Sequence, residues 1–174
     1  MTIGIGYDLA HQGPATIRRD WAGLLPDTDI ERLAAVSGLA GARARAALPR
    51  VASVVVPFAV ARKVFYLRSL PAYAVTTRGA YPGVEALPAD AQAALLSLVY
   101  NRGAGKQGER RREMAAIGPL VAEDDLAGIA MQIRAMKRLW DPRVLPGLID
   151  HREKEAQLVE HARRAYAPDE FARI

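Results

Sequence analysis

Near its start the sequence reads Thr2-Ile3-Gly4-Ile5-Gly6-Tyr7-Asp8, and the rest of the chain is interpreted outward from this stretch. Its alternation is typical of a short β-strand, but two glycines interrupt it. In a straight strand Thr2 and Asp8 would share one face about 20 Å apart. Glycine permits a turn at Gly4 or Gly6, which would bring the hydroxyl and the carboxylate together. Two interpretations stay open: a structural hairpin with an aspartate turn, or a polar pair that acts on one water molecule.

Beyond this stretch the chain is predicted to be helical, with proline and glycine between the helices. Thr28 and Glu31 have capping-box spacing. The clearest helix covers 89–102, and its apolar stretch from Leu95 to Tyr100 indicates a buried central helix. Further helices are expected over residues 28–38, 57–67, 107–117, 124–139 and 147–166, with shorter ones ending near 49 and 79. These patterns predict an α+β, mainly α fold with a small glycine-rich β-hairpin and about seven helices, in one domain over residues 1–174.

The composition of the 174 residues is that of a folded globular protein, with 51% hydrophobic and 25% charged residues. No apolar run approaches about 18 residues, so we expect no membrane span. The N-terminus lacks the basic and apolar regions of a secretory signal, and the chain is expected in the cytoplasm until it is released or exported. Because there is no cysteine, disulfides, thiol nucleophiles and thiolate metal sites are excluded.

The net charge of +5 comes from 20 arginines and only four lysines. Such a charge favours anionic partners, namely nucleic acid, acidic polymers or a bacterial envelope, without selecting among them. The arginine excess beside 33 alanines also fits a GC-rich genome. The densest basic run, Arg110 to Arg112, is flanked by Glu109 and Glu113, which is typical of a solvated helix face, although the run could contact phosphates. With 6% aromatic residues, no platform for stacking bases is evident.

The usual site patterns are not found. The three histidines, His11, His151 and His161, do not have metal-ligand spacing, so no metal or cofactor is expected. The segment Gly4-Ile5-Gly6 begins like a dinucleotide loop, but Leu9 stands at the third glycine position. Ser97 has no histidine or acid near it in sequence, and the acidic residues around His151 indicate an ion-paired helix surface.

Three segments, in the same order, resemble phage-type lysozymes of glycoside hydrolase family 24. TIGIGYDLAH, from residue 2, is similar to the family's TIGxGH/TIGIGYD hairpin, and its Tyr-Asp resembles the pesticin-like branch. ALLSLVYNRG, residues 94–103, is similar to the central helix, typically ALVSLVFNxG. Gly147-Leu148 with Arg152, Glu155 and Leu158 resembles the C-terminal GLxxRRxxEAxxL helix, with His151 in place of the first arginine. With Trp140, the likeness covers residues 2–10 and 90–162; residues 11–89 match weakly.

The resemblance implies a lysozyme-like fold and hydrolysis of the β-1,4 bond between N-acetylmuramic acid and N-acetylglucosamine in peptidoglycan. Such hydrolysis needs an acid for the leaving oxygen and a second group that positions water. Thr2 and Asp8 would be the catalytic residues that hold the water or stabilise positive charge on the sugar. Tyr7, Asn101 and Arg152 would bind the substrate. Peptidoglycan would be the partner, and no cofactor is implied.

The family's general acid is a glutamate on a helix about twenty residues before this threonine, and here only Met1 precedes it. Three hypotheses stay open: the true start lies upstream, the domain is inactive but still binds peptidoglycan, or another carboxylate such as Glu31, Glu85 or Glu109 is the acid. We expect this chain to lack the family's N-terminal helix and to expose apolar surface that a partner or a second copy could cover. A basic helical domain that binds nucleic acid is a further hypothesis, and it is not favoured.

Overall fold

The computed structural model describes residues 1–163 and 165–170 as mainly helical, with one small antiparallel sheet. This confirms the predicted α+β, mainly α class. The chain divides into two compact units, Met1–Pro71 and the described residues from Ala72 onward. Each unit has its own apolar core and is described by itself. The single domain expected over residues 1–174 stays a prediction.

The first unit opens with the hairpin. Strands β1 (Thr2–Ile3) and β2 (Tyr7–Asp8) pair antiparallel, with Thr2 opposite Asp8. The chain reverses with both Gly4 and Gly6 at positive φ, 53° and 72°, a conformation that favours glycine. The predicted turn at the glycines is therefore confirmed, and both of them are used. A side chain at Gly4 would also meet the Cβ atom of Ala61 at 3.0 Å, so this turn is closely packed.

The helices of the first unit surround one apolar core. They are α1 (Pro14–Trp21), α2 (Asp27–Ala34), α3 (Gly41–Ala47) and α4 (Phe58–Val64). The sequence analysis did not predict α1. Pro14 occupies its first turn, where a missing N–H costs nothing, and Ile17 and Trp21, four residues apart, bury one face. These two side chains pack with Leu9, Leu33 and Val36, none of which is exposed.

A π-helical turn, Phe65–Ser69, connects α4 to α5 (Leu70–Ala80), so two helices expected as separate elements are continuous. Its wider spacing is seen in the hydrogen bond from Leu70 N to Phe65 O. Pro71 has no N–H to donate, and in a regular α-helix its ring would clash with the carbonyl four residues earlier. The wider turn directly before Pro71 therefore lets the helix pass the proline.

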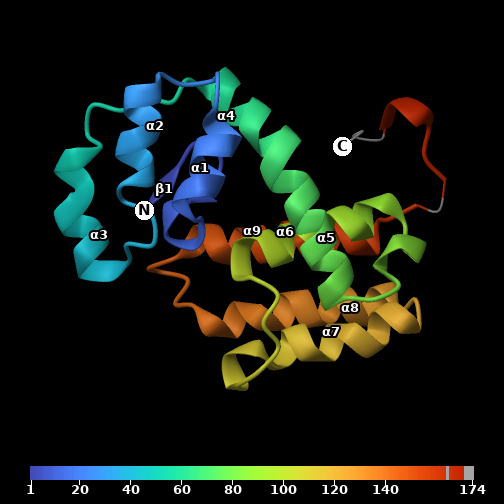
Figure 1. Cartoon of the computed structure of the whole chain (residues 1–174). Helices are drawn as coiled ribbons and strands as arrows, with labels where there is room; N and C mark the ends of the chain where they lie inside the picture. The colour runs from blue at the N-terminus through green and yellow to red at the C-terminus, as the bar shows by residue number, and fades with distance from the viewer. Residues whose placement is uncertain (164, 171–174) are drawn as a thin grey trace. The chain divides into compact units, whose positions relative to one another are not determined.

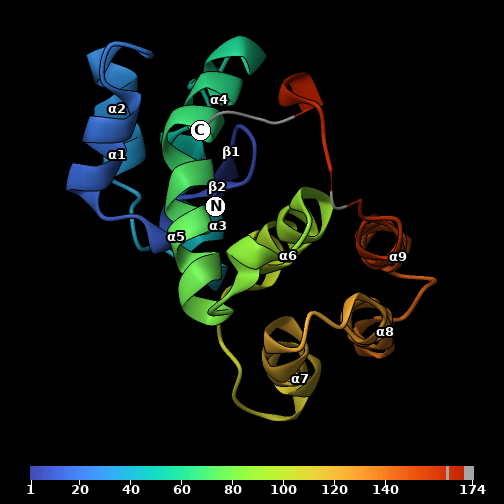
Figure 2. The same ribbon diagram turned by 90° about the vertical axis from the view of Figure 1, so that its right-hand side faces the viewer.

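The second unit is a group of packed helices, α6 (Ala89–Arg102), α7 (Arg112–Ala122), α8 (Leu126–Ala135) and α9 (Pro146–Glu160). As Figures 1 and 2 show, α8 lies between α7 and α9, and α6 packs on α9. Leu95, Leu98 and Val99 of α6 are fully buried, which confirms the predicted buried central helix.

Two boundaries of the second unit differ from the prediction. The segment expected as a helix over 107–117 begins with a 3-10 turn, Glu109–Arg111, and α7 continues to Ala122. The last helix ends at Glu160 instead of residue 166. None of the described helices is both long enough and apolar enough to cross a membrane.

Candidate functional site

The hairpin brings Thr2 and Asp8 together. Residues directly opposite in an antiparallel pair project to the same face, with Cβ atoms about 4.5–5.5 Å apart. Thr2 is exposed, and the Asp8 side chain keeps 38% of its surface accessible. A hydroxyl and a carboxylate thus share one solvent-facing side of the sheet, at a separation that one water molecule can bridge.

Asp8 also has a structural role. Its Oδ1 accepts a hydrogen bond of 3.0 Å from Ala10 N and so caps the 3-10 turn Leu9–His11. The amino nitrogen of Met1 lies 3.4 Å from the same oxygen, while Oδ2 lies 3.8 Å from Nε2 of His11, which is largely exposed. The aspartate turn and the polar pair therefore coexist. Oδ1 accepts a backbone hydrogen bond, and Oδ2 lies near the exposed side chain of His11.

Tyr7 points into the core. The side chain is 5% exposed, its hydroxyl donates to Asp20 Oδ2 at 2.9 Å, and its ring meets Trp21 edge-on at 5.4 Å. Burial, reinforced by Asp20, raises the pKa of Tyr7 far above its ordinary value. The predicted substrate contact of Tyr7 is not supported by this placement, because adjacent strand residues point to opposite faces and its hydroxyl is already bonded inside.

Two of the carboxylates proposed as alternative acids are held in ion pairs. Glu31 of α2 receives two hydrogen bonds from Arg18 of α1, at 2.6 and 2.8 Å, and these hold the pKa of Glu31 below its ordinary value. Glu109 receives one from Arg112 at 2.8 Å. A general acid must keep its proton near neutral pH, so the contact with Arg18 acts against this role for Glu31. Glu85 is exposed in the 3-10 turn Val84–Ala86.

A polar cluster in the second unit was missed at the sequence level. The Ser97 hydroxyl donates to Glu155 Oε1 at 2.6 Å, and His151 Nε2 lies 3.1 Å from Ser97 Oγ and 3.0 Å from Glu155 Oε1. This is not a serine triad, because Nε2 of His151 faces both Ser97 and Glu155. In a triad one ring nitrogen faces the serine and the other faces the carboxylate. Ser97 and Glu155 are 58 residues apart, so only tertiary packing of α6 on α9 reveals the contact.

Arg152 belongs to the same cluster. Its side chain is fully buried, and Nε and Nη2 each lie 2.8 Å from the Glu155 carboxylate. Burial raises the pKa of Glu155, and the Arg152 charge opposes this shift. With no exposed surface, Arg152 is placed to hold α9 together and not to touch a ligand directly, contrary to its predicted role. Its Nη1 is buried without a hydrogen-bond partner among the described residues.

Asn101, in contrast, is exposed and lines an open pocket of about 750 Å³ in the second unit. The pocket lies where the end of α6, the 3-10 turn before α7 and the start of α9 approach one another. Its walls are Asn101, Arg102, Gln107, Gly108, Glu109, Arg110, Arg111, Trp140 and Leu148. The Arg102 guanidinium lies 5.2 Å from the centre of the Trp140 ring, a cation–π distance.

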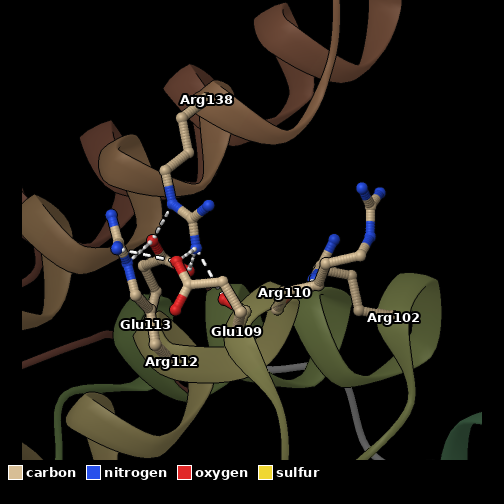
Figure 3. A network of polar contacts seen from close by, with 6 residues as sticks. All are labelled: Arg102, Glu109, Arg110, Arg112, Glu113 and Arg138. Carbon is tan, nitrogen blue, oxygen red and sulfur yellow. Dashed lines mark hydrogen bonds and ion pairs between the residues drawn. The ribbon is translucent and has the colours of Figure 1, made fainter.

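The two glutamates beside this pocket, Glu109 and Glu113, are both held in ion pairs with arginines. Glu113 is 2% exposed and accepts from Arg138 Nε at 2.5 Å and from Arg112 Nε at 3.1 Å. Burial opposes ionisation of Glu113, but these bonds outweigh it and lower its pKa. Glu109 pairs with the same two arginines, at 2.8 Å from Arg112 and 3.4 Å from Arg138 (Figure 3). Within the basic run, Arg112 pairs with these glutamates, whereas Arg110 and Arg111 form no ion pair among the described residues.

Within the described part of the chain, no group of three or more His, Asp or Glu side chains could hold a metal ion. The candidate chemistry consequently rests on two places: the Thr2–Asp8 face of the hairpin in the first unit, and the arginine-lined pocket in the second. Comparison of the chain with protein-family models, with curated proteins and with solved structures found no match.

Proposed function

We propose that this chain is a lysozyme-like domain that hydrolyses the β-1,4 bond between N-acetylmuramic acid and N-acetylglucosamine in peptidoglycan. The observation that carries the proposal is the hairpin register, which sets Thr2 opposite Asp8 across the glycine turn. The three sequence segments that resemble phage-type lysozymes support it. A lysozyme-like fold is part of the same proposal.

The geometry suits the water-positioning half of the reaction. Asp8 Oδ2 is free of backbone bonds and can accept a proton from water, while the Thr2 hydroxyl can hold the same water in place. The Asp8 carboxylate can also stabilise positive charge that develops on the sugar ring. This chemistry needs neither a metal nor an organic cofactor.

Protonation of the leaving oxygen is a separate requirement. Arg18 keeps Glu31 ionised, and Glu109 is shared by Arg112 and Arg138. The proposal therefore assigns water activation, and not leaving-group protonation, to the residues described above. A substrate whose leaving group needs no proton isolates the part of the reaction that is assigned.

The proposed site of action is the bacterial cell wall, and the proposed partner is peptidoglycan. The net charge of +5 suits this anionic polymer, because cationic surfaces concentrate anionic polymers around them. Asn101, exposed at the pocket of the second unit, keeps its predicted role in contacting the glycan.

One observation favours a second candidate, a peptidoglycan-binding module without turnover. In the first unit, the carboxylates of Asp20 and Glu31 are both engaged, Asp20 with Tyr7 and Arg19 and Glu31 with Arg18. Neither is available as an acid beside the hairpin. In this alternative Thr2 and Asp8 would bind sugar without activating water.

The test uses an N-acetylated disaccharide with a dinitrophenolate leaving group, which departs without protonation. We expect the chain to release dinitrophenolate above the buffer rate, and Asp8→Asn to lower that rate about 100-fold or more. Asp27→Asn, at an exposed position at the start of α2, is the matched control and should keep the rate.

Binding to purified sacculi separates the alternatives. Binding that is retained in Asp8→Asn, together with no release of dinitrophenolate by either protein, would establish the module without turnover. Absence of both binding and release would contradict both candidates. Tight, salt-sensitive binding of DNA with no affinity for sacculi would favour the nucleic-acid hypothesis.

A further inference from the structure

We propose that the arginine-lined pocket of the second unit is an oxyanion site that binds a phosphate group carried on a sugar or polyol. The inference concerns Arg102, Arg110 and Arg111. It does not depend on the hydrolysis assigned to Thr2 and Asp8, which belong to the other unit, and it shares with the proposed function only Asn101 in the pocket wall.

Among the described residues, six arginines of this region carry the argument, and the three outside the pocket wall have carboxylate partners. Arg112 and Arg138 share Glu109 and Glu113, and Arg152 is bonded to Glu155. The three that line the pocket, Arg102, Arg110 and Arg111, have no ion pair with a carboxylate among the described residues. Figure 3 shows Arg102 and Arg110 beside each other, apart from the two glutamates. The unpaired positive charge is thus gathered at the pocket.

Hydrogen-bond donors in the same place are also unsatisfied. Arg102 Nε and Arg111 Nη1 are buried without a partner in the described part of the chain. Arg102 Nη2 donates to the Arg110 carbonyl oxygen at 2.7 Å, which fixes the side chain at the pocket. Buried charged donors are costly when they remain unpaired, and phosphate oxygens match guanidinium geometry well. A bound phosphate would supply the missing acceptors.

Electrostatic crowding supports the same conclusion. Burial, followed by the charges of Arg111, Arg152 and Arg110, lowers the pKa of Arg102 below its ordinary value. The guanidinium groups therefore repel one another in the free protein. An anion between them would remove this repulsion, which increases the driving force for binding an oxyanion.

Charge and size indicate the ligand. Three arginines and Glu109 give the pocket wall a formal charge of +2, which matches the dianion of a phosphate monoester. The volume of about 750 Å³ is far larger than one phosphate ion, and Trp140 and Leu148 provide an apolar wall. Aromatic and apolar surface beside charged donors is typical of sites that hold an organic group as well. We therefore assign the pocket to a phosphorylated sugar or polyol rather than to free phosphate.

Calorimetric titration of the whole chain tests this assignment with N-acetylglucosamine 6-phosphate, glycerol 3-phosphate, inorganic phosphate and acetate. We expect the sugar or polyol phosphate to bind more tightly than inorganic phosphate, and acetate to bind weakest. Arg102→Met and Arg111→Met should each raise Kd about tenfold or more, because a charge-assisted bond is lost. Because Arg110 is exposed, Arg110→Gln should weaken binding without affecting folding.

Arg78→Met is the matched control, because Arg78 is an exposed arginine of α5 outside the pocket, and its Kd should not change. Equal weakening by Arg78→Met would show a general charge effect and overturn the proposal. No binding of any phosphate, or acetate binding as well as phosphate, would overturn it too. Tighter binding of single-stranded DNA than of the sugar phosphate would assign the surface to nucleic acid instead. If Arg102→Met fails to fold, Arg110→Gln and Arg111→Met decide.

Discussion

Successive residues of β2 serve different purposes, and the direction of each side chain decides which. Tyr7 points into the core and bonds to Asp20, whereas Asp8 faces solvent opposite Thr2. Both residues belong to the same short motif. The alternation of the strand is what separates a residue that stabilises the hairpin from one that can act on a substrate.

The first prediction concerns the Tyr7 hydroxyl. Tyr7→Phe removes the donor to Oδ2 of Asp20, a residue that is 5% exposed, while Oδ1 keeps its bonds from Arg19. We expect the free energy of unfolding to fall by about 1–3 kcal/mol, because a buried acceptor loses its partner. Urea denaturation at neutral pH measures this change.

Tyr66→Phe is the matched control for that measurement, since Tyr66 is 45% exposed. It should change the free energy of unfolding by less than about 0.5 kcal/mol. Equal stability of the two variants would show that the buried bond of Tyr7 contributes nothing.

The sequence was sufficient to predict a turn that brings Thr2 and Asp8 together, because glycine readily adopts the positive φ that a tight reversal needs. It was insufficient for Arg152, for which the resemblance to phage-type lysozymes implied a ligand contact. Arg152 is instead buried against Glu155, and this pairing depends on the packing of α9. The Ser97–Glu155 bond was equally hidden, since sequence spacing carries no information on contacts between α6 and α9.

At the scale of elements, helix ends follow tertiary contacts more than local motifs. The capping box expected from Thr28 and Glu31 is not formed, because α2 already begins at Asp27 and Glu31 pairs with Arg18 of α1. The missed helix α1 had a detectable signal in Pro14 followed by Ile17 and Trp21 at helical spacing.

A second prediction concerns the N-terminus of α8. The Asp125 carboxylate accepts a hydrogen bond of 2.8 Å from Gly128 N and so satisfies one free donor of the first turn. Asp125→Ala should lower the free energy of unfolding by about 1 kcal/mol, the usual effect of losing an N-cap. Glu123→Ala, at an exposed position two residues earlier, should leave it nearly unchanged. A smaller loss for Asp125→Ala than for Glu123→Ala would contradict the capping role.

A third prediction concerns the ion pairs between α8 and α9. Arg134 and Lys137 both donate to Glu153, and they lower the pKa of Glu153 to about 2 from an ordinary 4.5. The unfolded chain then binds this proton at higher pH than the folded chain does. The contribution of these ion pairs to the stability of the fold is complete above about pH 4.5, and it is lost as the pH falls toward about 2.

Urea unfolding across this pH range measures the effect. Glu153→Gln removes the titrating group and should make the decline of stability below about 4.5 shallower than in the original chain. Asp150→Asn, on the exposed side of α9, is the control. Parallel pH profiles for Glu153→Gln and the original chain would count against a stabilising role of these pairs.

At the scale of the whole molecule, the periodicity of apolar residues predicted the mainly helical class correctly, but not the division into two compact units. Periodicity shows which face of a helix is buried and not which partner buries it. Trp21 and Leu33 belong to the core of the first unit and Leu95 and Met114 to that of the second, yet all four have the same apolar character in the sequence.

A fourth prediction follows from the net charge of +5. If peptidoglycan is the partner, part of the attraction is electrostatic, and salt screens it. The fraction of the chain that sediments with purified sacculi should fall as sodium chloride is added, and neutral chitin should show a much weaker dependence. Binding to sacculi that is unaffected by salt would exclude a contribution of the basic surface.

The central claim is that Thr2 and Asp8 position a water molecule for attack on a sugar. The most direct measurement is the release of dinitrophenolate from the activated N-acetylated disaccharide by the original chain, Thr2→Val and Asp8→Asn, because this substrate requires no general acid. The account predicts turnover by the original chain and a loss of about 100-fold or more in Asp8→Asn, with a smaller loss in Thr2→Val. Turnover that survives unchanged in Asp8→Asn, or none in the original chain, would contradict it.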